Sequence, residues 1–389
     1  MYLQYEGKKA LSEIKNYRTP YTVLNFNTEN NLLIKGNNFD VMKIMLDQKN
    51  MAGKIDLVYI DPPFSTNAIF NTSKERANTI SKCANDTVAY KDTICGDAFL
   101  EFIRERLVLI KELLSENGSI YLHIDYKIGH YIKILMDEIF GSANFRNDIA
   151  RIKCNPKNFS RKAYGNIKDM ILFYAKTKKP IWNDLREKMN TEEIAKLFNK
   201  IDPDGRRYTT IPLHAPGETK EGPTGKPWRG IQPPKGRHWR SDPQTFEELD
   251  KNNLIEWSTN GVPRKKIYAD ESLGKKIQDI WEFKDPQKPL YPTEKNHEML
   301  KRIIAASSNP NSIIMDCFCG SGTTLLAAQQ LNRKWIGIDN SEEAILASKT
   351  KLQAYPFKYL ELIPQAATIK TPSLKIFEDD SFQAAIDIF

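Results

Sequence analysis

Cysteine and histidine are scarce in this chain, with five residues of each type among 389. The number of cysteines is odd, and their positions include no Cys-x-x-Cys pair: Cys83, Cys95, Cys154, Cys317 and Cys319. The pattern argues against a zinc knuckle and a disulfide-stapled secreted domain, and it predicts reduced thiols. Because the five histidines are scattered, we assign none of them as a general base and expect no metal cofactor.

Long apolar runs are also missing. No segment approaches the length of a membrane span, and the first nine residues are too polar for a signal peptide. We therefore expect a cytoplasmic protein without a membrane partner. The net charge of +8, with a pI near 8.9, is a modest excess that favours a polyanionic partner without identifying one.

The most informative feature that is present follows a short apolar segment. Residues 55–60 are β-branched, apolar and aromatic, which predicts a buried strand. Asp61, Pro62, Pro63 and Phe64 come directly after it, and two prolines cannot continue a sheet. A carboxylate, a stiff turn and an aromatic ring are thus expected at the carboxyl edge of a sheet, where open α/β folds bind ligands. Such a turn suits the exocyclic amino group of a flipped nucleobase.

A second motif lies near the other end of the chain. A predicted strand at 312–316 leads into the loop 318–324, which contains Gly320 and Gly322, and a further strand ends in Asp339. This unit predicts nucleotide binding, with Asp339 accepting hydrogen bonds from ribose hydroxyls. Leu325 occupies the third glycine position of a dinucleotide site. Asp316 suits the amino group of a methionine moiety, so S-adenosylmethionine fits better than NAD; a nicotinamide oxidoreductase is the alternative enzyme class.

The order of the expected elements gives the domain organisation. Strands and helices alternate through most of the chain, which predicts an α/β fold with a doubly wound, largely parallel sheet. We expect a lead-in at 1–30, a catalytic half at 31–177, an insertion at 178–285, a cofactor-binding half at 286–352 and a tail at 353–389. Residues 65–96 are expected to form a long polar loop.

The expected insertion is rich in basic residues. Between residues 205 and 240, eight Lys or Arg stand against two Glu, interleaved with Trp and Tyr. Basic side chains meet phosphates, and aromatic groups stack on or insert between bases. The candidate DNA contacts are Arg206, Arg207, Arg229, Lys235, Arg237, His238, Trp239, Arg240, Arg264, Lys265 and Lys266.

With both motifs considered together, the chain resembles the β group of DNA amino-methyltransferases, which includes the modification subunits of type III restriction systems. The family hallmarks are the Asp-Pro-Pro-aromatic turn, here 61–64, and the Phe-x-Gly-x-Gly loop, here 318–322, with the catalytic motif first. Gly36-Asn37-Asn38 and the segment 291–296 match two further family elements near the cofactor. The resemblance implies a seven-stranded Rossmann-like sheet with an inserted target-recognition domain.

The resemblance also implies the chemistry. Asp61 and the carbonyl of Pro62 would accept hydrogen bonds from the target amino group, Phe64 would stack on the base and Pro63 would stiffen the turn, while S-adenosylmethionine is converted to S-adenosylhomocysteine. The implied cofactor-binding residues are Asn37, Asn38, Asp61, Thr293, Lys295, Asp316, Cys317, Phe318, Gly320, Gly322, Thr323, Thr324, Asp339 and Asn340.

The implied substrate is double-stranded DNA in a bacterial cytoplasm. Asp at the first motif position favours adenine N6 over cytosine N4, which stays an alternative. A catalytically silent DNA-binding specificity subunit and an RNA or protein methyltransferase are alternatives of other classes. A restriction subunit and a second copy of the chain are the candidate protein partners.

Overall fold

The structure is a computed structural model, and it describes residues 2–63, 69–72, 77–78, 87–91, 96–156, 160, 162–286 and 294–365. The chain divides into two compact units. We call Met1–Asp184 with Gln278–Phe389 the sheet unit, and Leu185–Ile277 the inserted unit. The inserted unit falls inside the range 178–285 expected for the insertion.

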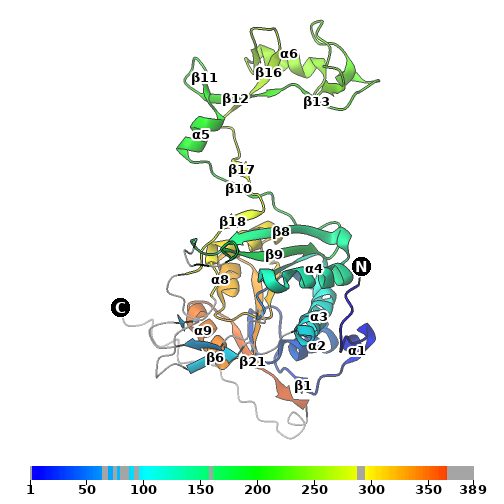
Figure 1. Cartoon of the computed structure of the whole chain (residues 1–389), viewed down its shortest axis with the longest axis vertical. Helices are drawn as coiled ribbons and strands as arrows, with labels where there is room; N and C mark the ends of the chain where they lie inside the picture. The colour runs from blue at the N-terminus through cyan, green and yellow to red at the C-terminus, as the bar shows by residue number, and fades with distance from the viewer. Residues whose placement is uncertain are drawn as a thin grey trace, which may run out of the picture. The chain divides into compact units, whose positions relative to one another are not determined.

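The sheet unit is built on one large sheet, which has nine strands within the described residues (Figure 1). β9 is antiparallel to both of its neighbours, and the other neighbouring pairs are parallel. The strands, in sheet order, are β18 (Ile280–Glu282), β8 (Phe145–Ile152), β9 (Lys168–Ala175), β7 (Leu114–Ile124), β3 (Ile55–Ile60), β19 (Ile313–Asp316), β20 (Lys334–Asp339), β2 (Leu32–Lys35) and β21 (Lys358–Glu361).

The α/β fold class is confirmed, but the expected strand number of seven is wrong. β18 and β21 each add a short parallel strand at one edge of the sheet. The residues of β21 were assigned to a C-terminal tail, because a four-residue strand with half-buried side chains gives only a weak sequence pattern. Pairing with β21 gives backbone N–H and C=O groups of β2 hydrogen-bond partners that they would lack if β2 were the edge strand.

The helices cover both faces of the sheet. Helices α2, α3 and α4 lie together on one side and α8 and α9 on the other (Figure 1), and α7 packs against α8. The helices of the sheet unit are α1 (Leu11–Asn16), α2 (Asn38–Asp47), α3 (Gly96–Leu113), α4 (Tyr126–Phe140), the 3-10 turn η1 (Ser142–Asn144), α7 (His297–Ser307), α8 (Thr323–Gln330) and α9 (Glu342–Leu352). Among the helices of the described residues, none is both long and apolar enough to cross a bilayer.

Alternation of side chains along the strands explains the two covered faces. On β7, Ile120 and Leu122 belong to the core that contains α2–α4, whereas Tyr121 points to the opposite face and hydrogen-bonds Ser307 of α7 at 2.8 Å. On β20, Ile336 and Ile338 face the same core as Ile120 and Leu122. Since both faces are buried, these strands are apolar throughout, as expected for a doubly wound parallel sheet.

Smaller strand pairs flank the large sheet. β1 (Tyr21–Thr22) pairs with β22 (Ile363–Pro364), so a segment that precedes the large sheet in sequence is joined to one that follows it. The range expected to be a polar loop, 65–96, instead contains three described strands, β4 (Ile69–Thr72), β5 (Ala77–Asn78) and β6 (Thr87–Lys91), which pair in the order β5-β4-β6.

The order in which strands are added to the sheet reverses between the parallel strands β3 and β19. From β3 the chain proceeds to β7 on one side, and from β19 it proceeds to β20 on the other. In open α/β sheets the crevice at such a switch point, at the carboxyl ends of the strands, is where ligands bind. The topology therefore places the residues that follow Ile60 and Asp316 at the two sides of one crevice.

The inserted unit has its own small core. It contains the four-stranded sheet β11-β12-β16-β15, the hairpin β13-β14 and the pair β10-β17. Its elements are β10 (Arg186–Glu187), α5 (Thr191–Leu197), β11 (Lys200–Ile201), β12 (Arg207–Pro212), β13 (His214–Pro216), η2 (Pro223–Gly225), β14 (Arg237–Trp239), α6 (Pro243–Lys251), β15 (Ile255–Trp257), β16 (Pro263–Tyr268) and β17 (Lys275–Lys276).

Trp239 was expected to contact DNA, and this prediction is wrong. The Trp239 side chain is 2% exposed and packs edge-on against Phe246 with Trp228 beside it. Its indole nitrogen donates to the carbonyl of Lys226 at 2.9 Å. A unit of this size needs large aromatic side chains to form a core, so the tryptophans among the basic residues stabilise the fold rather than face a ligand.

Gly337 offers a test of how tightly α8 packs on β20. A Cβ atom at this position would lie 2.3 Å from Cδ1 of Leu325, which is fully buried. We expect Gly337→Ala to lower the free energy of unfolding by about 1–3 kcal/mol through overpacking. Chemical denaturation measures the effect.

Gly165→Ala is the matched control, because Gly165 is exposed and a Cβ there has nothing within 4 Å. The control should change stability by no more than about 0.5 kcal/mol. Equal stabilities of the two variants would show that α8 is not in close contact with β20.

Candidate active site

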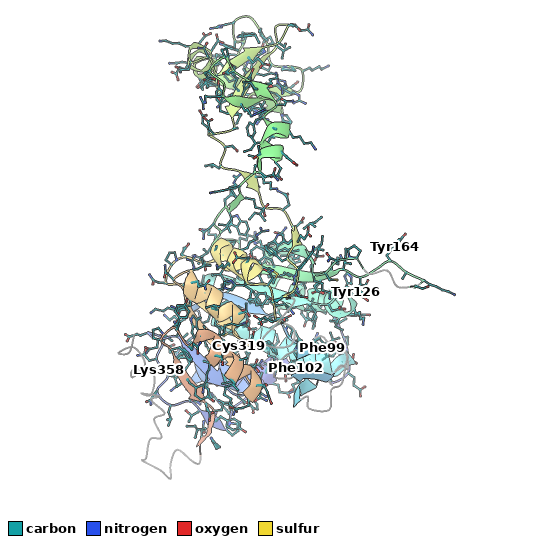
Figure 2. The ribbon with its side chains drawn as sticks, turned by 90° about the vertical axis from the view of Figure 1, so that its left-hand side faces the viewer. Phe99, Phe102, Tyr126, Tyr164, Cys319 and Lys358 are labelled. Carbon is teal, nitrogen blue, oxygen red and sulfur yellow. The ribbon has the colours of Figure 1, made fainter. Side chains whose placement is uncertain are left out.

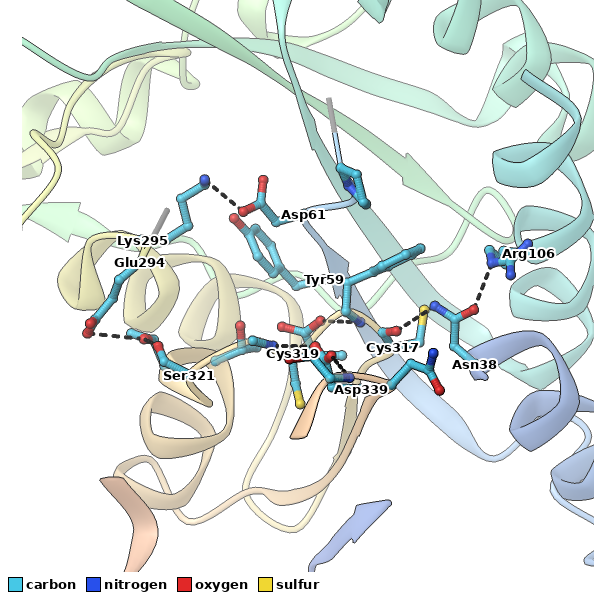
Figure 3. Close-up of a pocket in the computed structure, with 18 of the residues that line it drawn as sticks. Asn38, Tyr59, Asp61, Arg106, Glu294, Lys295, Cys317, Cys319, Ser321 and Asp339 are labelled. Atoms are coloured by element: carbon cyan, nitrogen blue, oxygen red, sulfur yellow. Dashed lines mark hydrogen bonds and ion pairs between the residues drawn. The ribbon is translucent and has the colours of Figure 1, made fainter. Parts of the chain in front are cut away.

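A cavity of about 370 Å³ lies at the carboxyl ends of the central strands. It is bordered by residues that follow β3, β19, β20 and β2, and by side chains of α3 and of the segment before α7 (Figure 3). Its volume is in the range of sites for small ligands and cofactors. The cavity therefore occupies the crevice that the strand order predicts.

Asp61 presents two different carboxylate oxygens. Oδ2 lies 2.7 Å from Nζ of Lys295, and both side chains are largely buried (Figure 3). Oδ1 is buried and has no hydrogen-bond partner among the described residues. An unpaired buried acceptor is costly unless a ligand satisfies it. This oxygen is consequently a candidate acceptor for a donor group of a substrate.

Two further carboxylates share the cavity. Asp316, at the end of β19, is 2% exposed and accepts a hydrogen bond from the backbone N–H of Phe318 at 3.0 Å. The pKa of Asp316 is raised to about 7, chiefly by burial; the charges of Asp61 and Asp339 act in the same direction, and hydrogen bonds from Thr324 and Phe318 act against it. Burial also raises the pKa of Asp339. A cavity with these carboxylates favours a ligand that carries positive charge.

The glycine loop is shaped around Asp339. The backbone N–H of Gly320 donates to Oδ2 of Asp339 at 2.9 Å, and the N–H of Ser341 donates to Oδ1 at 3.0 Å. Gly322 has a left-handed backbone, with φ of 74°, and precedes the first turn of α8. A Cβ at Gly322 would lie 2.8 Å from the hydroxyl of Ser348, so only glycine fits this position without strain.

Asn38 joins the two halves of the cavity wall. Its amide nitrogen donates to the carbonyl of Cys317 at 2.7 Å, and its amide oxygen accepts from Nε of Arg106 at 2.7 Å. The Arg106 guanidinium lies 3.5 Å from the ring centroid of Phe102, and burial lowers its pKa to about 10. Phe102 and Phe318 have ring centroids 6.1 Å apart, so this end of the cavity presents aromatic surface.

The opposite end is closed by an ion pair. Nζ of Lys351 lies 2.5 Å from Oε1 of Glu294, and it also donates to the hydroxyls of Ser321 at 2.9 Å and Thr323 at 2.7 Å. Burial lowers the pKa of Lys351. These contacts attach α9 and the segment before α7 to the glycine loop.

A buried polar chain leads away from the cavity at Tyr59, which lies on β3. The Tyr59 hydroxyl is 2.9 Å from Nδ1 of His123, whose Nε2 lies 3.2 Å from Asp169. Burial lowers the pKa of His123, so this imidazole is neutral near pH 7. The chain fixes the ring of Tyr59 beside Asp61.

Most of the residues predicted from sequence to form the site line this cavity. The predicted residues found there are Asn37, Asn38, Asp61, Pro63, Lys295, Asp316, Cys317, Phe318, Gly320, Thr323, Thr324, Asp339 and Asn340. Pro62 and Gly322 do not line it, although Gly322 caps α8. Phe64 and Thr293 lie outside the described residues.

Sequence reasoning missed several lining residues. Phe102 and Arg106 lie on α3, whose regular apolar pattern predicted only a core-facing helix. An arginine on the apolar side of that helix was the available signal. Figure 2 shows Phe102 and Cys319, which both border the cavity although 217 residues separate them in sequence.

The predicted DNA contacts of the inserted unit fall into two groups. Some are paired within the unit: Arg206 with Asp270 and Glu271, Arg229 with Glu247 and Asp250, and Lys266 with Asp202, while Arg264 hydrogen-bonds Thr210. Others have no carboxylate partner among the described residues. They are Arg207, Lys235, Arg237, Arg240 and Lys265. His238 forms a hydrogen bond with the backbone carbonyl of Gly217.

Comparisons with known proteins agree with this geometry. The family model described as DNA methylase matches residues 55–350. The chain is 40% identical over 334 residues to the type II methyltransferase M.EcaI of Enterobacter cloacae, an alignment that covers 84% of this chain and 69% of that protein. It is 28% identical over 367 residues to the StyLTI Mod subunit of Salmonella typhimurium, covering 84% of this chain and 54% of that subunit.

A third relative is the EcoP15I Mod subunit of Escherichia coli, with 25% identity over 371 residues that cover 78% of this chain and 56% of that subunit. The chain thus spans about half the length of the Mod subunits it matches. The family model covers 55–350 and contains the residues on both sides of the cavity, from Asp61 to Asp339. The chain belongs to the DNA methylase family.

Proposed function

We propose that this chain binds S-adenosylmethionine in the cavity and methylates the N6 amino group of adenine in double-stranded DNA at a specific sequence. The observation that carries the proposal is the position of Asp61, which has an unpaired Oδ1 among the described residues and lines the same cavity as the glycine loop. A methyl donor and a target amino group bound there would meet at one edge of the sheet.

The residues present fit the cofactor in charge and in shape. Asp316 suits its ammonium group, and Asp339 retains acceptor capacity for ribose hydroxyls beside the glycine loop. The aromatic end formed by Phe102 and Phe318 suits a purine ring. When bound, the cofactor supplies a methyl group on a positively charged sulfur.

The chain would act on the target base by holding its amino group. Asp61 accepts one hydrogen bond through Oδ1, and the backbone carbonyl of Pro62 accepts the other. These two acceptors orient the nitrogen lone pair toward the methyl group. The nitrogen would gain the methyl group as the bond between that group and sulfur breaks, and it would then release one proton to solvent water. Positioning and electrostatics carry most of the rate enhancement, and the target base reaches the site by flipping out of the duplex.

Adenine is favoured over cytosine because the first residue of the catalytic motif is aspartate. Methylation of cytosine N4 is the second candidate. Analysis of nucleosides from DNA of a host that expresses the chain, by mass spectrometry, separates N6-methyladenine from N4-methylcytosine. Because the StyLTI and EcoP15I Mod subunits belong to type III restriction-modification enzymes, we propose that this chain acts in a restriction-modification system, with a restriction subunit and a second copy of the chain as candidate partners.

Replacing the catalytic carboxylate tests the proposed role of Asp61. Asp61→Asn keeps the size of the side chain but puts an amide next to Lys295 and the target. We expect the turnover rate to fall by roughly 100-fold or more, with S-adenosylhomocysteine affinity largely kept. Transfer of a tritiated methyl group and calorimetry measure the two quantities.

Asp148→Asn is the control, because Asp148 is exposed on β8 of the same sheet. It should leave turnover unchanged. Near-normal turnover of the Asp61 variant would refute the assignment.

The raised pKa of Asp316 predicts that cofactor affinity depends on pH. A cationic ligand binds best to the ionised carboxylate, so binding lowers the pKa of Asp316 from about 7 and displaces its proton. Affinity should be greatest above pH 7 and should fall by up to about tenfold per pH unit as the pH drops below 7.

Calorimetry in buffers of different ionisation enthalpy would record the proton released on binding near pH 6. Asp316→Asn should bind more weakly and without this dependence. A flat profile in the wild type would show that Asp316 stays ionised in the free protein.

The basic side chains of the inserted unit that have no carboxylate partner among the described residues predict a salt-dependent contact with DNA. Arg237 and Arg240 are exposed and flank the buried Trp239. We expect replacement of both by Ala to weaken duplex binding and to reduce the slope of log affinity against log salt by roughly one per residue. Fluorescence anisotropy at several salt concentrations measures the slope. Replacement of Lys179, an exposed residue outside the inserted unit, is the control, and equal slopes would place the DNA surface elsewhere.

A further inference from the structure

Lys295 makes a contact that the proposed reaction does not itself require. The family resemblance assigns the segment around Lys295 to the cofactor, yet its ammonium lies 2.7 Å from Oδ2 of the catalytic carboxylate, Asp61. The Lys295 side chain is 9% exposed and that of Asp61 is 15% exposed. Removing one partner of an ion pair so far removed from water would leave the other charge buried and uncompensated, which is costly.

The segment that carries Lys295 is fixed by the residues on each side of it. Glu294 binds Lys351 and lies 3.5 Å from the hydroxyl of Thr323, so it is attached to the glycine-loop side of the cavity. Asn296 caps α7 by accepting from two backbone N–H groups, and its amide nitrogen donates to the carbonyl of Lys284. Lys295 therefore projects into the cavity from a segment that has little freedom to move.

The contact also decides which carboxylate oxygen is available. Lys295 engages Oδ2, and Oδ1 remains without a partner among the described residues. Without the ammonium, the Asp61 carboxylate could rotate about its side-chain bonds and offer either oxygen. With the ammonium in place, Oδ2 is bound to Lys295 and the direction of Oδ1 is fixed.

Charge gives a second reason for the pair. The ionisable groups that act on Asp61 from the surrounding strands are Tyr59 of β3, His123 of β7 and Asp316 of β19. Tyr59 and His123 are neutral near pH 7, and Asp316 is of the same sign as Asp61. Lys295 is thus the cation that balances the catalytic carboxylate in this part of the described cavity.

We propose that Lys295 is a positioning residue: it binds Oδ2 of Asp61 so that Oδ1 is presented to the amino group of the target base. Glu294, through its ion pair with Lys351, sets the distance between the Lys295–Asp61 pair and the glycine loop. The inference rests on the proposed function and assigns a new role within it.

The test compares Lys295→Met, Lys295→Arg and Lys301→Met with the wild type. Met keeps the approximate length of lysine without its charge, and Arg restores the charge. Lys301 is the matched control, because it lies on α7 in an exposed ion pair with Glu298. Tritium transfer gives kcat and the KM for the cofactor, and calorimetry gives the affinity for S-adenosylhomocysteine.

We expect Lys295→Met to lower kcat about 100-fold, as a misplaced reacting group does, while the KM for the cofactor and the affinity for S-adenosylhomocysteine stay close to wild type. Lys295→Arg should recover a large part of the loss, and Lys301→Met should match the wild type.

A binding measurement tests the same contact without chemistry. In the presence of S-adenosylhomocysteine, a duplex with adenine at the target position is compared with one that has purine, which lacks the amino group. The ratio of the two affinities should fall toward one in Lys295→Met and stay at the wild-type value in Lys301→Met, since any difference in base pairing is common to all variants.

The outcomes separate this inference from the proposed function. Active wild-type enzyme, together with a normal kcat and an unchanged adenine-to-purine ratio in Lys295→Met, overturns the role of Lys295 alone. Loss of S-adenosylhomocysteine binding in Lys295→Met also overturns it, because Lys295 would then be a cofactor ligand. A wild-type chain that binds the cofactor but transfers no methyl group to DNA overturns the proposed function, and the inference with it.

Discussion

Burial of carboxylates at the carboxyl ends of β3 and β19 is the constraint on which the site depends. Asp61 and Asp316 follow neighbouring parallel strands, so the sheet itself brings them to one cavity. Such groups are stable as anions only when cations or hydrogen-bond donors surround them. Lys295 meets this need at Asp61. Asp339 accepts from two backbone N–H groups and Asp316 from one, and burial still raises the pKa of both carboxyls.

The part of the site that follows from the sequence is local. Asp61 was placed at a strand end by two prolines, and Asp316 by a strand that runs into glycines. Their meeting in one cavity followed from the general rule for parallel sheets, because every strand that contributes runs in the same direction. Motifs that are short and adjacent to strand ends are therefore predictable without coordinates.

The features that were missed depend on three-dimensional packing. Arg106 lies on a helix whose pattern indicates only a core face, and its contacts with Asn38 and Phe102 join segments far apart in sequence. His123 is one of a run of buried strand residues, and nothing in that run shows that it faces Tyr59. The prediction that Trp239 contacts DNA was wrong for a related reason. Basic and aromatic residues alternate in sequence both in a DNA-binding surface and in a small domain whose aromatic core has a charged exterior.

The charges of the cavity bear on product release as well as on binding. The methyl donor carries a positive charge on sulfur, and the proposed reaction removes that charge while leaving the rest of the molecule intact. The carboxylates of the cavity attract the donor more strongly than its product, because one Coulombic partner disappears. Lys295 limits this preference, since it already neutralises Asp61. The remaining attraction comes from Asp316 and Asp339, so the same groups that select the charged cofactor would favour exchange of the spent one.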